Sequence, residues 1–289
     1  MNNQLNIFQN QERPTKITNV ASVPQRSPFR YPGGKTWLIP VVRKWLKQYH
    51  ASQIILSEPF AGGGIVSLTA AFENLASKVI MIELDTEVAA VWETIFSDNN
   101  QWLADQIIQL DLTIENAQQI LNKEDKDIRE IALATILKNR IFHGGIMAKG
   151  SGLIKNGENG KGILSRWYPK TLFNRIRAID FIKDKVCFLQ GDAFEFLDAN
   201  KINKDMCFFI DPPYFKAAKR LYKHYDINHY DLFKLASQIE GHFLMTYDDD
   251  PEIRELIDIF NLDYIRIPMK TTHHLEKYEL LITDKLIEI

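Results

Sequence analysis

Apolar residues along this chain alternate between short continuous runs and stretches of helical period. Short runs such as 54–56, 79–82 and 206–210 have the length of buried strands. Between them, apolar residues recur every three or four positions, as at 66–75, which is typical of helices packed on a sheet. The pattern predicts an α/β fold with a doubly wound, mostly parallel sheet.

The end of the chain departs from this alternation. Two strand candidates, 263–268 and 278–283, follow each other without a helical segment between them. Parallel strands need a long crossover connection, usually a helix, whereas antiparallel strands do not. We therefore expect these two strands to form an antiparallel hairpin at one edge of the sheet.

A helical segment interrupts the strands after residue 97. Helical period covers 102–110, 114–121 and 128–142, and an irregular, glycine-rich run follows at 143–162. This pattern predicts a mainly helical inserted domain. The predicted division is a flexible N-terminal arm at 1–26, a catalytic domain at 27–97 and 185–289, and the inserted domain at 98–184.

Composition is that of an ordinary globular protein with no overall attraction to nucleic acid. The 289 residues are 45% hydrophobic and carry a net charge of -2. Cys187 and Cys207 lie in apolar runs, which favours buried thiols and a reducing compartment. No apolar run reaches the roughly 18 residues of a membrane span, and the polar N-terminus lacks a signal peptide's apolar stretch. We expect a soluble, cytoplasmic protein.

Positive charge is concentrated in one segment. Between residues 138 and 177 there are nine Lys or Arg and one acid, Glu158, so the local charge is +8 and the rest of the chain carries -10. Such segregation is typical of phosphate contact, with a solvated basic face as the alternative. The candidate DNA-binding residues are Lys138, Arg140, Lys149, Lys155 and Arg166.

Asp211-Pro212-Pro213-Tyr214 is the main candidate for chemistry. It follows the apolar run 206–210, so an acid, two stiff prolines and an aromatic stand where a buried strand ends. In open α/β sheets, ligands bind at the carboxyl ends of the strands. Three more features are predicted at such ends, and they are Gly62 to Gly64, Glu83 and Asp192.

Each of these features also has a structural interpretation. Successive glycines between a strand and a helix allow close approach to a ligand, but their spacing is not the dinucleotide fingerprint. Glu83 stands where an acid would accept the ribose hydroxyls of a nucleoside cofactor, or is a solvated acid. Asp192 would accept from an adenine amino group or cap the next helix. His273-His274 lacks partners at ligand spacing, so no metal is expected.

Five motifs occur in the order in which a known family has them. They are Phe29 to Lys35, Glu58 to Gly64, Gly191-Asp192, Asp211 to Tyr214 and Lys277 to Thr283. Together they resemble the Dam-like N6-adenine DNA methyltransferases of the Asp-Pro-Pro-Tyr type, between residues 27 and 285. The resemblance implies a Rossmann-like methyltransferase fold, S-adenosyl-L-methionine as the cofactor, and adenine in double-stranded DNA as the substrate.

The resemblance also implies roles for individual residues. Asp211 and the Pro212 carbonyl would accept hydrogen bonds from the target amine, and Tyr214 would stack on a base flipped out of the duplex. Lys35 would lie near the methionyl carboxylate, or is an ordinary first-turn lysine, and Phe60 would border the cofactor or belong to the core. The full set of cofactor candidates is Tyr31, Gly34, Lys35, Phe60, Gly62, Glu83, Asp85, Asp192 and Asp211.

Several alternatives stay open at this point. The family places target recognition in the inserted segment, but the Asn-Gly that many relatives have after Phe is His143-Gly144 here, so the target sequence cannot be transferred. A cytosine N4 amine or a base in RNA would suit the same site, and a catalytically idle DNA-binding subunit would keep the same fold. A cognate restriction endonuclease is a further partner to consider.

Overall fold

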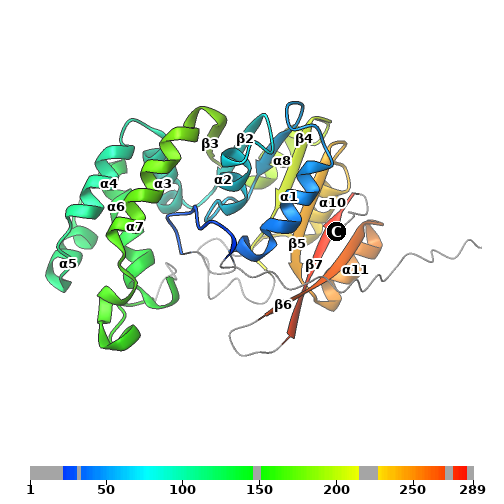
Figure 1. The fold of residues 1–289 in the computed structure, drawn as a ribbon. Coiled ribbons are helices and arrows are strands. Elements are labelled where there is room, and N and C mark those ends of the chain that lie inside the picture. Colours follow the sequence, from blue (N-terminus) through cyan, green and yellow to red (C-terminus); the bar gives the residue numbers. More distant parts are fainter. Residues whose placement is uncertain (1–21, 31–33, 146–150, 215–226, 271–275, 285–289) are drawn as a thin grey trace, which may run out of the picture.

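The structure, a computed structural model, describes residues 22–30, 34–145, 151–214, 227–270 and 276–284. At its centre lies one seven-stranded sheet of order β3-β2-β1-β4-β5-β7-β6 (Figure 1). Strands β1 to β5 pair in parallel, and β7 runs antiparallel to both β5 and β6. The predicted mostly parallel sheet with an antiparallel edge hairpin is therefore confirmed. The strands are β1 (Ile55–Glu58), β2 (Lys78–Glu83), β3 (Val186–Gln190), β4 (Met206–Ile210), β5 (His242–Asp248), β6 (Asp263–Lys270) and β7 (Glu276–Thr283).

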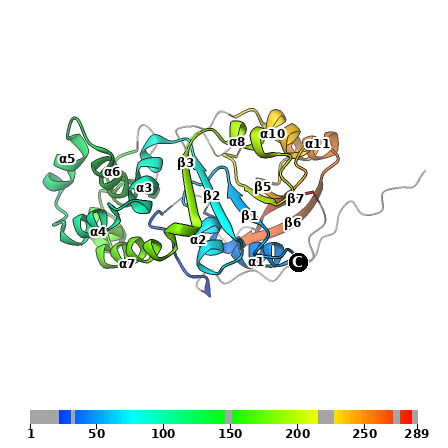
Figure 2. The ribbon, with the colours of Figure 1, turned by 90° about the horizontal axis from the view of Figure 1, so that it is seen from above.

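Helices cover both faces of the sheet. Successive residues of a strand point to opposite faces, so a strand that is apolar throughout must be covered on both sides. In β4, Cys207 and Phe209 pack into one cluster of buried residues, and Phe208 and Ile210 pack into another. A strand buried on both faces has no polar alternation, as the apolar run 206–210 shows. One face carries α1 (Ile39–Lys47) and α2 (Ile65–Phe72), and the other carries α8 (Ala193–Asn200), α10 (His229–Ala236) and α11 (Pro251–Ile259) (Figure 2).

A group of helices extends beyond the β3 edge of the sheet (Figures 1 and 2). Buried residues of this group, such as Leu103, Ile136 and Ile176, belong to the same continuous hydrophobic cluster as Leu56 of β1. The helices predicted for this part of the chain are present, but they share a core with the sheet, so a separate inserted domain stays a prediction. The helices are α3 (Thr86–Phe96), α4 (Asn100–Gln109), α5 (Ile114–Asn122), α6 (Ile128–Ile141) and α7 (Pro169–Ile179).

The last residues of the predicted N-terminal arm pack against the protein. Val23 is buried, Arg26 donates to Glu73 Oε1 at 3.2 Å, and the Arg26 guanidinium lies 4.4 Å from the centre of the Phe72 ring. The prediction of a flexible arm is wrong for residues 22–26, because one buried side chain and one ion pair hold a segment that has no apolar period. Residues 1–21 lie outside the described part of the chain.

A buried acid joins β1 to α2. Glu58 ends β1, and its Oε2 accepts a hydrogen bond of 2.9 Å from the backbone N–H of Ser67 in the first turn of α2. The first N–H groups of a helix have no partner within the helix, and Gly64, which precedes α2, has no side chain to supply one. Burial raises the pKa of Glu58 to about 8, although the hydrogen bond from the Ser67 backbone opposes this rise.

We expect the Glu58→Gln variant to gain stability relative to the wild type as pH rises. The folded-state pKa is about 8 against an ordinary value of 4.5, so the folded protein binds more protons than the unfolded chain between these values. The free energy of unfolding therefore falls with pH across that window. The amide removes this titration and keeps an acceptor for Ser67.

Denaturant unfolding of both proteins near pH 5 and near pH 8 measures the effect. The difference between variant and wild type should move in the variant's favour by about 1 kcal/mol or more, since one pKa unit corresponds to about 1.4 kcal/mol. An equal difference at both pH values would contradict the prediction.

Candidate active site

The carboxyl ends of four neighbouring strands bring the predicted site residues to one edge of the sheet. Gly62 follows β1, Glu83 ends β2, Asp192 follows β3 and Asp211 follows β4. These strands are parallel and adjacent in the order β3-β2-β1-β4, so their ends lie side by side (Figure 1). The sheet therefore has the convergence of polar groups that the sequence predicts for a ligand site.

Glu83 holds the loop after β1 through the backbone. Its Oε2 accepts from the N–H of Gly62 and its Oε1 accepts from the N–H of Asp85, both at 2.8 Å. Burial raises the pKa of Glu83 to about 7, although these two hydrogen bonds oppose the rise. Each carboxylate oxygen has a second acceptor position. Glu83 can thus fix the loop and still accept hydrogen bonds from ribose hydroxyls.

Gly64 has a packing role that does not depend on a ligand. Its φ of 61° lies in the left-handed region, where glycine is favoured. A Cβ at this position would lie 2.6 Å from Met81 Cε and 3.0 Å from the Trp92 ring. Trp92 in turn donates from Nε1 to the Gly62 carbonyl at 2.9 Å. Close contact with β2 and α3 therefore accounts for part of the glycine run.

Asp85 and Asp192 both cap helices. Asp85 Oδ1 accepts from two backbone N–H groups at the start of α3, at 2.8 and 3.3 Å. Asp192 Oδ1 does the same at the start of α8, at 2.7 and 3.2 Å. The helix-cap interpretation of Asp192 is therefore confirmed. Contact of either residue with a cofactor stays a prediction.

Aromatic rings stand beside these acids. Phe60 follows β1, and its ring meets that of Phe194 edge to face, with the centroids 6.3 Å apart. Both rings are partly buried against the core of the α8 face. The combination of flat apolar rings, the Glu83 carboxylate and the backbone of a glycine loop matches the groups of an adenine nucleoside. The residues present thus fit the cofactor that the resemblance implies.

Asp211 accepts from two side chains through one oxygen. Its Oδ1 lies 2.7 Å from Thr246 Oγ1 and 3.0 Å from Lys35 Nζ. Lys35, only 3% exposed, begins η2 (Lys35–Leu38), and its Nζ also lies 3.9 Å from Glu279 Oε2 on β7. Lys35 thus lies beside two carboxylates of the protein, and its predicted place near the methionyl carboxylate stays a prediction.

The two carboxylates and the lysine change one another's protonation. Burial lowers the pKa of Lys35, but the charges of Asp211 and Glu279 outweigh burial, and the net shift is upward. Burial raises the pKa of Glu279 to about 7, against the opposing charge of Lys35. The cluster therefore keeps its lysine protonated near neutral pH.

Tyr214 is held by stacking. Its ring lies parallel to that of Tyr247 within 23°, with the centroids 5.7 Å apart, and Lys35 Nζ lies 4.7 Å from the Tyr214 ring centre. Tyr247 is itself fixed, because its hydroxyl lies 2.8 Å from His229 Nδ1. Burial raises the pKa of both tyrosine hydroxyls, so both stay protonated. A ring fixed in this way is a suitable surface for stacking a base.

The basic segment contains fewer exposed charges than its sequence implies. Arg140, 7% exposed, donates to the Pro28 carbonyl, and burial lowers its pKa to about 10. The prediction that Arg140 contacts DNA is wrong, because its guanidinium lies in the interior. Lys138 pairs with Glu87 Oε1 at 2.6 Å. Composition counts charges but cannot say which face of α6 carries them.

Other basic residues of the segment divide in the same way. Arg175 donates to the Ser27 carbonyl at 2.9 Å, and Arg177 donates to Asn100 Oδ1 at 2.7 Å, so both hold the fold together. Arg166 is partly buried. The exposed lysines of the segment, among the described residues, are Lys155, Lys161 and Lys170.

Some predicted residues lie outside the described part of the chain, namely Tyr31, Lys149 and His273-His274, whereas Gly34 is described and exposed. Among the described residues, no group of three His, Cys, Asp or Glu could hold a metal ion. None of the described helices is long and apolar enough to cross a membrane.

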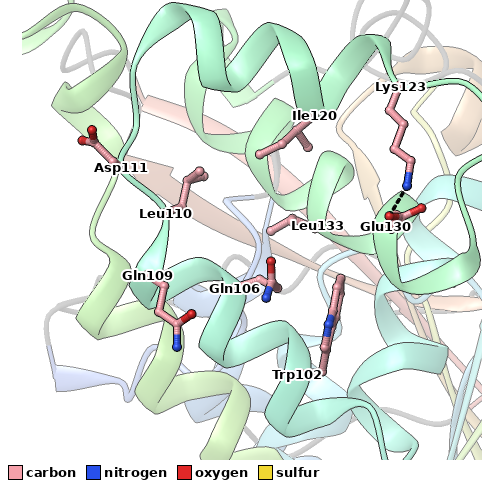
Figure 3. A pocket seen from close by; sticks show the side chains of 9 residues that line it. All are labelled: Trp102, Gln106, Gln109, Leu110, Asp111, Ile120, Lys123, Glu130 and Leu133. Carbon is pink, nitrogen blue, oxygen red and sulfur yellow. Dashed lines mark hydrogen bonds and ion pairs between the residues drawn. The ribbon is translucent and has the colours of Figure 1, made fainter.

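A pocket of about 420 Å³ lies in the group of helices away from the strand ends. Side chains of α4, α5 and α6 line it, including Trp102, Gln106 and Ile120, and an ion pair joins Lys123 to Glu130 (Figure 3). The lining contains neither the glycine loop nor the Asp-Pro-Pro-Tyr segment. The candidate active site is therefore the edge of the sheet and not this pocket.

Thr246 and Glu279 both belong to the Asp211 cluster, although neither is a predicted site residue. Glu279 could have been noticed in the sequence, since it is the single acid in the otherwise apolar run 278–282. An acid within a buried strand needs a partner. Thr246 carries no such signal, because threonine is common in strands.

Comparisons with known proteins agree with the resemblance. The family model described as D12 class N6 adenine-specific DNA methyltransferase matches residues 31–266. Among curated protein sequences, none matches this chain. The sheet order and the family match together make this a Rossmann-like methyltransferase fold.

Solved structures show only a distant likeness. The rRNA methyltransferase aviRa from Streptomyces viridochromogenes is 10% identical, with 88% of this chain and 86% of that chain covered and a TM-score of 0.40. The precorrin-6y C5,15-methyltransferase from Geobacter metallireducens is 8% identical, with 88% and 92% covered and a TM-score of 0.36. Likenesses of this size say nothing about the reaction. The family match does, and the chain belongs to the D12 class N6 adenine-specific DNA methyltransferases.

Proposed function

We propose that this protein transfers a methyl group from S-adenosyl-L-methionine to the N6 amino group of adenine in double-stranded DNA. The observation that carries the proposal is the Asp-Pro-Pro-Tyr segment at the end of β4, in which Asp211 is held by Thr246 and Lys35 and Tyr214 is stacked on Tyr247. Family membership supports the reaction type, and the segment supports the roles of its residues.

The ends of β1, β2 and β3 would hold the cofactor. Glu83 would accept from the ribose hydroxyls, and Phe60 with Phe194 would pack against the adenine. When bound, S-adenosyl-L-methionine supplies an electrophilic methyl group on a positively charged sulfur. Burial raises the pKa of Glu58 and of Glu83, and a cationic ligand beside them would favour the charged form of both acids.

Asp211 would orient the target amine. The N6 lone pair is delocalised into the adenine ring, so the free amine is a poor nucleophile. Hydrogen bonds from N6 to Asp211 and to the Pro212 carbonyl would draw the nitrogen toward tetrahedral geometry and point its lone pair at the methyl group. The lone pair would form the new N–C bond as the C–S bond breaks with its electron pair left on sulfur, and the surplus proton of N6 would pass to solvent. Positioning and local electrostatics would supply most of the acceleration.

The target base would leave the duplex before methylation, because N6 cannot reach these groups while the base is stacked. Tyr214 would stack on the flipped base, and Tyr247 would support the Tyr214 ring from behind. Duplex backbone would lie against the exposed lysines of the basic segment, Lys155, Lys161 and Lys170. A cytoplasmic location and a cognate restriction endonuclease stay predictions.

Transfer of label tests this function. Protein, duplex DNA and methyl-labelled S-adenosyl-L-methionine are incubated, and the DNA is digested to nucleosides. We expect the label in N6-methyl-2′-deoxyadenosine. Label in N4-methylcytosine or in RNA would establish one of the alternative acceptors, and cofactor binding with no transfer to any acceptor would establish an idle subunit.

We expect Asp211→Asn to lower the rate of methyl transfer by about 10²-fold or more, since loss of one preorganised polar contact in an active site costs that much. Binding of S-adenosyl-L-methionine, measured by calorimetry, should change little, because Glu83 and Phe60 stay in place. Asp205→Asn is the matched control, because Asp205 is exposed and lies at the other end of the same strand. Full activity of the Asp211→Asn protein would contradict the assigned role.

We expect replacement of Lys155, Lys161 and Lys170 by alanine to weaken DNA binding in a salt-dependent way. Each lost phosphate contact should reduce the slope of log affinity against log salt by about 0.9. Affinity measured between low and moderate salt gives this slope.

The control for this experiment replaces three exposed lysines near the amino ends of the parallel strands, away from the proposed site. Lys47 ends α1, Lys78 begins β2 and Lys204 precedes β4. Both triple variants lose the same charge. Equal effects of the two variants would mean that net charge, and not the basic segment, governs binding.

A further inference from the structure

We propose that Thr246 is a positioning residue for methyl transfer. Its hydroxyl fixes the carboxylate of Asp211 so that the protein holds one oxygen and the other is left for the target amine. This inference rests on the proposed function and adds to it a residue of β5 for which the sequence gives no chemical signal.

Strand register brings Thr246 to Asp211. Strands β4 and β5 pair in parallel, and Ile210 lies opposite Met245. The residues that follow these two, Asp211 and Thr246, are therefore neighbours at the carboxyl ends of the strands. The side chains of Met245 and Tyr247 pack into the core of the α10 face. Thr246 therefore points to the opposite face, together with Leu244.

The face that Thr246 points to is also the face of Lys35. Glu279 lies on this face as well, because Leu281, two residues along β7, packs there and is the direct partner of Thr246 across the strands. Thr246 is fully buried, so water cannot replace its contacts. The hydroxyl, the ammonium and the two carboxylates therefore form one cluster, in which the Asp211 side chain stays 22% exposed.

Hydrogen-bond chemistry then distinguishes the two oxygens of Asp211. An ionised carboxylate only accepts, so the Thr246 hydroxyl donates to Oδ1, and the 2.7 Å distance is normal for such a bond. The Lys35 ammonium donates to the same oxygen at 3.0 Å. Both contacts named here are made to Oδ1 and not to Oδ2. Oδ2 is therefore the oxygen left for N6.

Lys35 alone would not fix the carboxylate. An ammonium on a flexible stem acts as a point charge and sets no orientation. It also has a second carboxylate, Glu279, at 3.9 Å, toward which it can shift. Thr246 is β-branched and lies in a buried strand, so its hydroxyl direction is restricted. Two donors from different elements, β5 and η2, then define how the carboxylate is turned.

This arrangement predicts a rate effect without a binding effect. Loss of the hydroxyl would let Asp211 turn and misplace Oδ2, and misplacement by about 1 Å costs about 10²-fold in rate. We expect Thr246→Val, which keeps the shape of the side chain, to lower kcat by about 10- to 100-fold. The KM values for cofactor and DNA should stay within a few-fold of wild type. Thr246→Ser restores the hydroxyl and should recover most of kcat.

Thr135→Val is the matched control for loss of a buried hydroxyl. Thr135 lies in α6, is as buried as Thr246, and donates to the Ile131 carbonyl at 2.8 Å. Melting temperatures of all three variants show how much stability each one loses. A merely structural role of Thr246 would lower stability in both valine variants and leave kcat unchanged in both.

The outcomes separate this inference from the proposed function. The measurement is steady-state transfer of labelled methyl to duplex DNA over a range of cofactor and DNA concentrations, which gives kcat and KM separately. Loss of kcat in Thr246→Val with recovery in Thr246→Ser supports the inference. An active wild type with unchanged kcat in Thr246→Val overturns it, as does a loss confined to KM. A wild type that transfers no methyl group overturns the proposed function itself and this role with it.

Discussion

A buried lysine shared by two carboxylates holds together the edge of the sheet at which the chemistry is proposed. Lys35 begins η2, Asp211 follows β4 and Glu279 lies in β7. The cluster thus connects the beginning, the middle and the end of the sequence. Removing one partner of such a buried pair leaves an uncompensated charge, at a cost of about 3–5 kcal/mol. The position of Asp211 therefore depends on residues far from it in sequence.

The same edge carries a conflict between stability and ligand binding. Burial raises the pKa of Glu58, Glu83 and Glu279, which means that the fold holds these carboxylates in surroundings that disfavour their charge. A cationic ligand bound beside these acids would favour their charged form, and the acids would in turn stabilise the ligand. Proteins often keep such unfavourable groups at functional sites and stabilise the fold elsewhere. Here the continuous core that joins the sheet to the helices beyond β3 provides that stability.

Much of the positive charge of the basic segment is bound within the protein and does not lie free on its surface. The segment from 138 to 177 is strongly basic, yet Lys138, Arg140, Arg175 and Arg177 bond to other parts of the chain. These contacts hold the helices beyond β3 to the N-terminal residues and to one another. Among the described residues, the exposed lysines of this segment are Lys155, Lys161 and Lys170, which lie between α6 and the first turn of α7. Any interface with DNA is therefore narrower than a count of residues suggests.

The sequence by itself determined the parallel sheet with its edge hairpin, the convergence of Gly62, Glu83, Asp192 and Asp211, and the family. These features depend on local period and on motif order, which a linear sequence contains. Only the tertiary structure decided that Arg140 is buried, that Gly64 is needed for packing, and that Thr246 and Glu279 belong to the Asp211 cluster. The physical reason is that burial and hydrogen-bond partners arise from strand register and helix packing. Residues far apart in sequence then meet, and no pattern along the chain records their distance.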